Sequence, residues 1–228
     1  MRNIKKNIMR KFLLLSFLII LSCYLFAASK HDVVKVACVG NSITYGAGVK
    51  DKYNDSYPGV LRSMLGDGYD VHNFGVSGRT LLNKGDNPYM KEKKFEEALA
   101  FCPDIVTIKL GTNDSKPRNW KYKADFKHDL LEMIDRFSSL ESKPKIYLCL
   151  PVPAFSDNFT IDNNVIRDEI IPVIKEVAKE KGLDVINLYD TLMPYKQNFP
   201  DGIHPNEDGS YLIAREISRV IKGGFEKL

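Results

Sequence analysis

The chain has 228 residues, of which 44% are hydrophobic and 27% are charged. This length and composition predict one globular domain with a sizeable core, and they exclude a disordered or low-complexity protein. The net charge of +4 arises in residues 1–28, which hold five of the 33 basic residues and none of the 29 acidic ones. Because the remainder is close to neutral, we expect no nucleic-acid partner.

Residues 1–28 have the pattern of a targeting segment. Five basic residues between Arg2 and Lys11 precede the uncharged run "FLLLSFLIILSCYLFAA". This order is typical of a secretory signal, although the length of the run also fits a retained membrane anchor. A third alternative is lipid attachment at Cys23, because "ILSC" loosely resembles a bacterial lipobox. We expect an exported protein, periplasmic or extracellular, with membrane attachment only through this leader and a single domain over residues 29–228.

Strand-like and helix-like segments alternate after the leader. Five short apolar runs occupy residues 33–40, 69–76, 104–111, 145–152 and 183–189. Apolar residues at helical spacing fall between 126 and 137, between 166 and 177, and between 212 and 221. This alternation predicts an α/β fold, in which a five-stranded parallel sheet lies between two helical layers with flavodoxin-like topology.

Polar residues follow the ends of the predicted strands. Ser42, Gly78 and Asn113 come after the first, second and third runs, and His204 precedes the last helical segment. The carboxyl ends of parallel strands meet at one edge of a sheet, which is where such folds carry their sites. We therefore expect these four residues to lie close together.

These residue types suit the hydrolysis of an ester. A serine hydroxyl is a poor nucleophile until a neighbouring base takes its proton, and His204 is the candidate base for Ser42. Asp201, three residues earlier, can accept from the other ring nitrogen and fix the tautomer. The backbone N–H groups of Ser42 and of Gly78 or Gly75, and the side-chain amide of Asn113, can donate to the oxyanion.

Three cysteines lie outside the leader. Cys38 and Cys149 fall within predicted strands, and Cys102 lies between them in the sequence. Their odd number gives no disulfide framework, so we expect buried free thiols in the strands. Neither CxxC nor HExxH occurs, and we predict no metal and no cofactor.

Four segments together resemble the SGNH hydrolases, also called GDSL-type esterases. They are "GNSIT" at 40–44, "NFGVSGRT" at 73–80, "GTND" at 111–114 and "DGIHPN" at 201–206. The four blocks of that family supply a serine, a glycine, an asparagine and a histidine in this order. The resemblance implies a Ser42–His204–Asp201 triad and an oxyanion hole formed by Ser42, Gly78 and Asn113. Asn41 stands where the commonest pattern has an aspartate.

The first two blocks resemble bacterial carbohydrate O-acetylesterases, including sialate O-acetylesterases. This resemblance implies hydrolysis of small acyl esters, most of all acetyl groups on a glycan or other small molecule. Asn41, Arg79 and Trp120 are candidate substrate contacts, and a tryptophan face can stack on a sugar ring. An alternative for Trp120 is a structural position beneath a surface loop.

Other functions remain open from the sequence. A lipase, lysophospholipase or thioesterase would use the same residues on a different acyl group. A non-catalytic glycan-binding module would keep the fold without the chemistry. A flavin-binding electron carrier fits the sheet and the glycines of "GNSITYGAG", but it leaves "DGIHPN" without a purpose.

Overall fold

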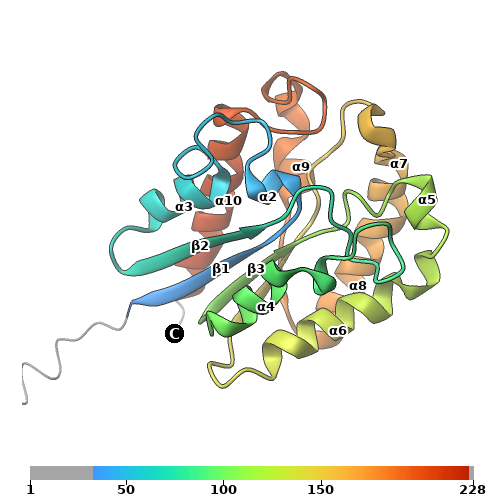
Figure 1. The fold of residues 1–228 in the computed structure, drawn as a ribbon. Helices are drawn as coiled ribbons and strands as arrows, with labels where there is room; N and C mark the ends of the chain where they lie inside the picture. Colours follow the sequence, from blue (N-terminus) through green and yellow to red (C-terminus); the bar gives the residue numbers. More distant parts are fainter. Residues whose placement is uncertain (1–32, 226–228) are drawn as a thin grey trace, which may run out of the picture. The chain divides into compact units, whose positions relative to one another are not determined.

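The computed structural model describes residues 33–225, so the predicted leader and Cys23 lie outside the described residues. One parallel sheet contains β1 (Val34–Gly40), β2 (Tyr69–Gly75), β3 (Ile105–Lys109), β4 (Lys145–Cys149) and β5 (Asp184–Ile186). The strands lie in the order β2-β1-β3-β4-β5 (Figure 1). This is the order of flavodoxin-like folds, so the predicted sheet and topology are confirmed.

Helices cover both faces of the sheet. One layer contains α3 (Tyr57–Leu65), α9 (Leu188–Leu192) and α10 (Glu207–Phe225), and the other contains α4 (Lys93–Ala100), α6 (Phe126–Ser138) and α8 (Ile171–Lys181) (Figure 1). Side chains alternate along β1, so Val36 and Cys38 enter the first core, whereas Ala37 and Val39 enter the second. The two apolar cores hold the three layers together.

Short elements complete the described chain. They are α2 (Ser42–Tyr45), α5 (Pro117–Trp120), α7 (Asn163–Val165), the 3₁₀ turns Tyr89–Lys91, Lys123–Asp125, Asn158–Thr160 and Met193–Asn198, and a π-helical turn at Ile166–Ile170. The π turn runs directly into α8, where Pro172 lacks the N–H that a regular helix would use. The predicted helix at 166–177 is therefore present with a local distortion.

Two strands are shorter than their apolar runs. β3 ends at Lys109, before the polar segment that begins at Gly111. β5 covers only Asp184–Ile186, because Asn187 accepts the N–H of Asp190 and begins α9. The apolar residues beyond Asn187 are helical residues packed on the sheet.

Cys38 and Cys149 are buried free thiols, as predicted. Burial raises the pKa of each to about 12, although hydrogen bonds lower that of Cys38 and the charge of Lys109 lowers that of Cys149. None of the helices between residues 33 and 225 is both long and apolar enough to cross a membrane.

Candidate active site

The end of β1 positions Ser42 at the carboxyl edge of the sheet. Asn41 begins helix α2 by accepting the N–H of Ile43 on its Oδ1, at 3.1 Å. A side chain at Gly40 would collide with Thr44 Oγ1, so glycine lets α2 turn back closely onto the strand. Ser42 is the first residue of α2, where its own N–H has no acceptor within the helix.

Two segments far apart in the sequence meet at this edge. His204 Nε2 lies 2.9 Å from Ser42 Oγ, although 162 positions separate the two residues. His204 Nδ1 lies 2.6 Å from Asp201 Oδ2. Helix α2 and the loop before α10 lie at the same end of the sheet in Figure 1. The structure thus brings three predicted residues into one hydrogen-bonded chain.

Local hydrogen bonds shape the segment that carries the histidine. Asp201 Oδ1 accepts the N–H of Ile203 at 2.8 Å and that of His204 at 2.7 Å. Asn206 Oδ1 accepts an N–H in the first turn of α10, at 3.0 Å. The carboxylate and the imidazole are therefore held by a turn on one side and by a helix start on the other.

The protonation of this chain follows from the surroundings of Asp201. Partial burial alone would raise the pKa of Asp201, but hydrogen bonds from the backbone and ring of His204 and from Ile203 hold that pKa below its usual value. An ionised carboxylate only accepts, so Nδ1 of His204 donates to it. The neutral ring then presents Nε2 as an acceptor for the Ser42 hydroxyl, which is the polarity that proton removal from serine requires.

The loop after β4 supports the segment at Asp201, and the sequence reasoning missed this. Ser156 Oγ and Asn158 Nδ2 donate to the backbone oxygen of Asp201, at 2.9 and 2.6 Å. Phe155 donates its N–H to the oxygen of Gly202 at 2.8 Å. The sequence signal that could have indicated this support is the position of the loop, which also follows the carboxyl end of a strand.

Phe159 extends from the same loop toward the histidine. Its ring centre lies 5.5 Å from that of His204, and 57% of the residue is exposed. Phe159 and Thr160 both have left-handed backbones, with φ of +59° and +57°. Such conformations cost about 1–3 kcal/mol each in non-glycine residues, and they cluster at functional sites.

Asn113 is hydrogen-bonded to the residue that follows Gly78. Gly78 has φ of +81°, a backbone conformation that favours glycine. Its N–H donates to no acceptor within residues 33–225. Asn113 Nδ2 donates to the backbone oxygen of Arg79, the next residue, at 3.1 Å. The second amide hydrogen of Asn113 is left for a ligand.

Asp114 joins the loops that carry these two donors. Its carboxylate accepts the N–H of Leu81 at 3.0 Å and that of Leu82 at 2.8 Å, and the residue is fully buried. Burial raises the pKa of Asp114 to about 6, although these backbone hydrogen bonds oppose the rise. Asp114 thus positions the loops that follow β2 and β3.

The three candidate substrate contacts each have a structural role within the protein, and their contact with a substrate stays a prediction. Asn41 is fully buried, because its side chain caps α2. Trp120 is 8% exposed and packs edge-on against Phe126, since burial of its large ring stabilises the core beneath α5 and α6. Arg79 turns its guanidinium to Glu92, at 2.8 Å, and so is already paired.

One cluster has residue types that can bind a metal. Ligand atoms of His128, Asp129 and Glu132 lie within 4.8 Å of one another. Asn83, however, donates to Asp129 from its backbone at 2.7 Å and to Glu132 from its side chain at 2.9 Å. The cluster is thus explained as an anchor for the loop that contains Asn83, and we assign no metal to it.

Known proteins are similar to this chain. Residues 38–212 match the GDSL-like Lipase/Acylhydrolase family. An acetylxylan esterase of Xylanibacter ruminicola is 47% identical over 213 residues, which are 86% of this chain and 44% of that protein. A rhamnogalacturonan acetylesterase of Bacillus subtilis is 26% identical over 191 residues, 74% of this chain and 79% of that protein. The chain thus spans less than half of the acetylxylan esterase.

A solved structure shares the fold. A carbohydrate acetylesterase from Sinorhizobium meliloti superposes with a TM-score of 0.69 at 19% sequence identity. The superposition covers 83% of this chain and 99% of that chain. At this identity the likeness concerns the fold alone. The family match itself covers most of the chain, from β1 into α10. The resemblance carried by the four sequence blocks is thereby confirmed, and this chain belongs to the GDSL-like lipase/acylhydrolase family.

Proposed function

We propose that this protein is a serine esterase that removes acetyl groups from carbohydrates. The observation that carries the proposal is the 2.9 Å contact between Ser42 Oγ and His204 Nε2. A partly buried carboxylate behind the imidazole, at 2.6 Å, completes the arrangement that activates a serine. Ser42, His204 and Asp201 are the proposed catalytic residues.

The acylation step follows from these positions. Ser42 Oγ attacks the acetyl carbonyl carbon while His204 Nε2 takes the hydroxyl proton. Negative charge develops on the carbonyl oxygen, and the N–H groups of Ser42 and Gly78 and the amide of Asn113 donate to it. The intermediate then collapses, its bond to the sugar oxygen breaks, and His204 returns the proton to that oxygen. The sugar leaves with a free hydroxyl, and the acetyl group stays on Ser42.

Water completes the reaction by the reverse route. His204 takes a proton from a water molecule that attacks the acetyl carbonyl of the ester on Ser42. The same donors stabilise the second oxyanion. Acetic acid leaves as the proton returns to Ser42 Oγ, which regenerates the starting hydrogen-bonded chain.

The choice of a carbohydrate substrate has two supports. Two relatives that match over most of this chain are named for acetyl esters of xylan and of rhamnogalacturonan. Phe159 also offers an exposed aromatic face beside His204, and such faces stack on the apolar side of a sugar ring. We include export through residues 1–28 in the proposal, since acetylated polysaccharides lie outside the cell.

Acetate release from a panel of acetylated xylan, pectin and sialic acid tests this proposal. We expect wild type to release acetate and Ser42→Ala to release none while keeping its circular dichroism spectrum. Faster cleavage of p-nitrophenyl octanoate than of the acetate ester would favour the lipase alternative. Retained activity in folded Ser42→Ala would contradict the assignment, and a coloured purified protein would favour a flavin carrier.

A further inference from the structure

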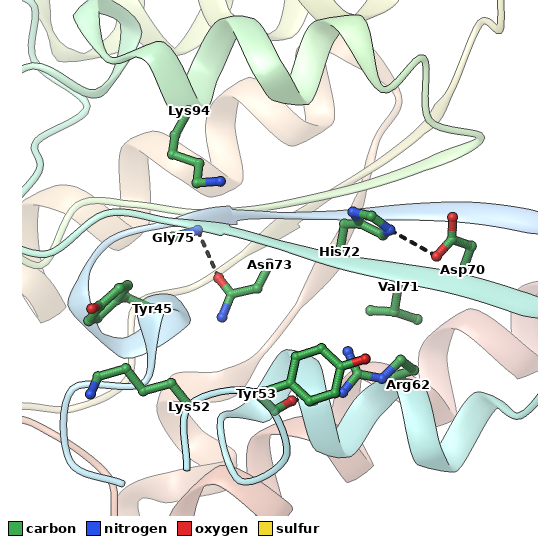
Figure 2. Close-up of a pocket in the computed structure, with 11 residues that line it drawn as sticks. Tyr45, Lys52, Tyr53, Arg62, Asp70, Val71, His72, Asn73, Gly75 and Lys94 are labelled. Carbon is green, nitrogen blue, oxygen red and sulfur yellow. Dashed lines mark hydrogen bonds and ion pairs between the residues drawn. The ribbon is translucent and has the colours of Figure 1, made fainter. Parts of the chain in front are cut away.

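A groove runs along the open edge of the sheet. β2 is an edge strand, and the hollow beside it has a volume of about 460 Å³. Figure 2 shows Tyr45 and Gly75 toward one end of the hollow and Arg62 and Asp70 toward the other. We call this hollow the β2 groove. It is distinct from the Ser42 site, because neither Ser42 nor His204 lines it.

The cationic side chains of the β2 groove differ in their partners. Lys52 and Arg62 make no ion pair within residues 33–225, whereas Lys94, above the strand, pairs with Glu97 at 2.7 Å. The acid of the lining, Asp70, lies 2.9 Å from His72 Nε2, toward the end of the groove away from Tyr45 (Figure 2). Asp51 interacts electrostatically with Arg62, which also donates to the backbone oxygen of Tyr53 at 2.8 Å. Lys52 is thus the cation of the groove that is most available to an anionic ligand.

Lys52 and Arg62 each lie over an exposed tyrosine. Lys52 Nζ is 5.5 Å from the ring centre of Tyr45, and Arg62 Cζ is 4.0 Å from that of Tyr53. Tyr45 is 42% exposed and Tyr53 is 71% exposed, so both rings are open to a ligand. An aromatic body next to a cation fits a ligand that combines an apolar ring face with a carboxylate, such as a uronic acid.

The edge of β2 is partly closed to a peptide strand. Asn73 Oδ1 accepts the N–H of Gly75 at 2.9 Å, and its Nδ2 donates to the oxygen of Thr44 at 2.8 Å. A strand added to this edge would have to displace the Asn73 side chain to pair with Gly75. The side chains that line the hollow, rather than its backbone, are thus the groups offered to a ligand.

The β2 groove begins one helical turn from the proposed nucleophile. Tyr45 ends helix α2, and Ser42 begins it. Their separation along the helix axis is about 4.5 Å, from a rise of about 1.5 Å per residue. We propose that the β2 groove binds a carboxylate-bearing sugar of an acidic polysaccharide whose acetylated residue lies at Ser42. This inference rests on the proposed function and narrows its substrate to acidic glycans.

Binding of non-acetylated ligands tests the groove without catalysis. Isothermal titration calorimetry would compare oligogalacturonate with neutral xylohexaose on wild type and on Ser42→Ala. We expect both proteins to bind oligogalacturonate more tightly, with an affinity that falls as salt is added. Lys52→Glu should weaken that binding by about tenfold or more, and Lys52→Arg should retain it. Lys50→Glu, an equal charge change at an exposed position outside the lining, should leave it unchanged.

Three results would overturn the inference. The first is equal affinity for the acidic and the neutral oligosaccharide, and the second is an equal loss of affinity in Lys50→Glu and Lys52→Glu. The third is binding of poly-L-glutamate as tight as that of oligogalacturonate, because this would indicate a general anion-binding surface. Kinetics add an independent test, because Lys52→Glu should lower kcat/KM about tenfold more on acetylated glucuronoxylan than on acetylated neutral xylan. If wild type binds oligogalacturonate but releases no acetate from any ester, the proposed function fails and the groove stands.

Discussion

The Ser42 edge and the β2 groove differ in how their polar side chains are satisfied. Ser42, His204 and Asp201 are hydrogen-bonded to one another, with backbone groups holding the carboxylate from the other side. In the β2 groove, Lys52 and Arg62 contact tyrosine rings and form no salt bridge among the described residues. Groups that make and break bonds must be fixed before the substrate arrives, whereas groups that recruit a ligand keep their charge available.

We expect the largest losses of activity for substitutions at the hydrogen-bonded Ser42 edge. Asp201→Asn should lower kcat by about 10⁴, because an amide can hold His204 in the wrong tautomer while leaving its position intact. Steady-state kinetics on p-nitrophenyl acetate would measure this loss, with circular dichroism as the control for folding. A fall of only a few fold would mean that the 2.6 Å contact is structural.

Asn113→Ala should have the next largest effect. Loss of one oxyanion donor typically lowers kcat by about 10²–10³ with little change in KM. The same variant removes the bond from Asn113 to the Arg79 oxygen, so thermal unfolding should accompany the kinetics. A higher KM at unchanged kcat would show that Asn113 binds the ground state instead.

Phe159→Ala should raise KM for acetylated xylo-oligosaccharides, by up to about tenfold if stacking on a sugar ring is as strong as between aromatic rings, about 0.5–1.5 kcal/mol. The rise should be smaller for p-nitrophenyl acetate, which has no sugar, and Phe159→Trp should keep the low KM. Equal rises on both substrates would instead indicate that Phe159 acts through the position of His204.

Substitution of Asp114 should have a smaller effect, on the free energy of unfolding, and this effect should depend on pH. Its pKa of about 6 lies above the ordinary value of 3.8, so folding favours the protonated form. The stability that this group contributes is therefore full below pH 3.8 and is lost as pH rises toward 6. The difference in unfolding free energy between wild type and Asp114→Asn should shrink between these values, by up to about 3 kcal/mol. Urea unfolding at several pH values would measure it, and a difference that grows with pH would contradict the prediction.

Much of the fold follows from the sequence because its signals are local. Strand-length apolar runs and apolar residues at helical spacing show which segments are buried against a core. For this reason the sequence predicted all five strands and the helices around Phe126, Ile174 and Ile217. The contact between Ser42 and His204 was also expected. Ser42 follows the end of β1, and His204 lies in a loop that the sequence places at the same edge of the sheet.

The features that the sequence did not reveal are those whose position depends on tertiary packing. Trp120 lies in a polar stretch, and only the contact with Phe126 reveals that it is buried. The loop that holds Ser156 and Phe159 has no periodicity, so nothing in its sequence indicates contact with residues 201–204. The β2 groove combines residues from α2, β2, α4 and the segment around α3, which no single pattern connects.

Covalent labelling tests the central claim most directly, namely that contact with His204 makes Ser42 nucleophilic. A fluorophosphonate forms a stable bond to an activated serine, and peptide mass spectrometry locates the modified residue. We predict one phosphonyl group per wild-type chain, on Ser42, and a labelling rate that falls by orders of magnitude in His204→Ala. Labelling at another residue, or equally fast labelling of Ser42 without His204, would contradict the claim.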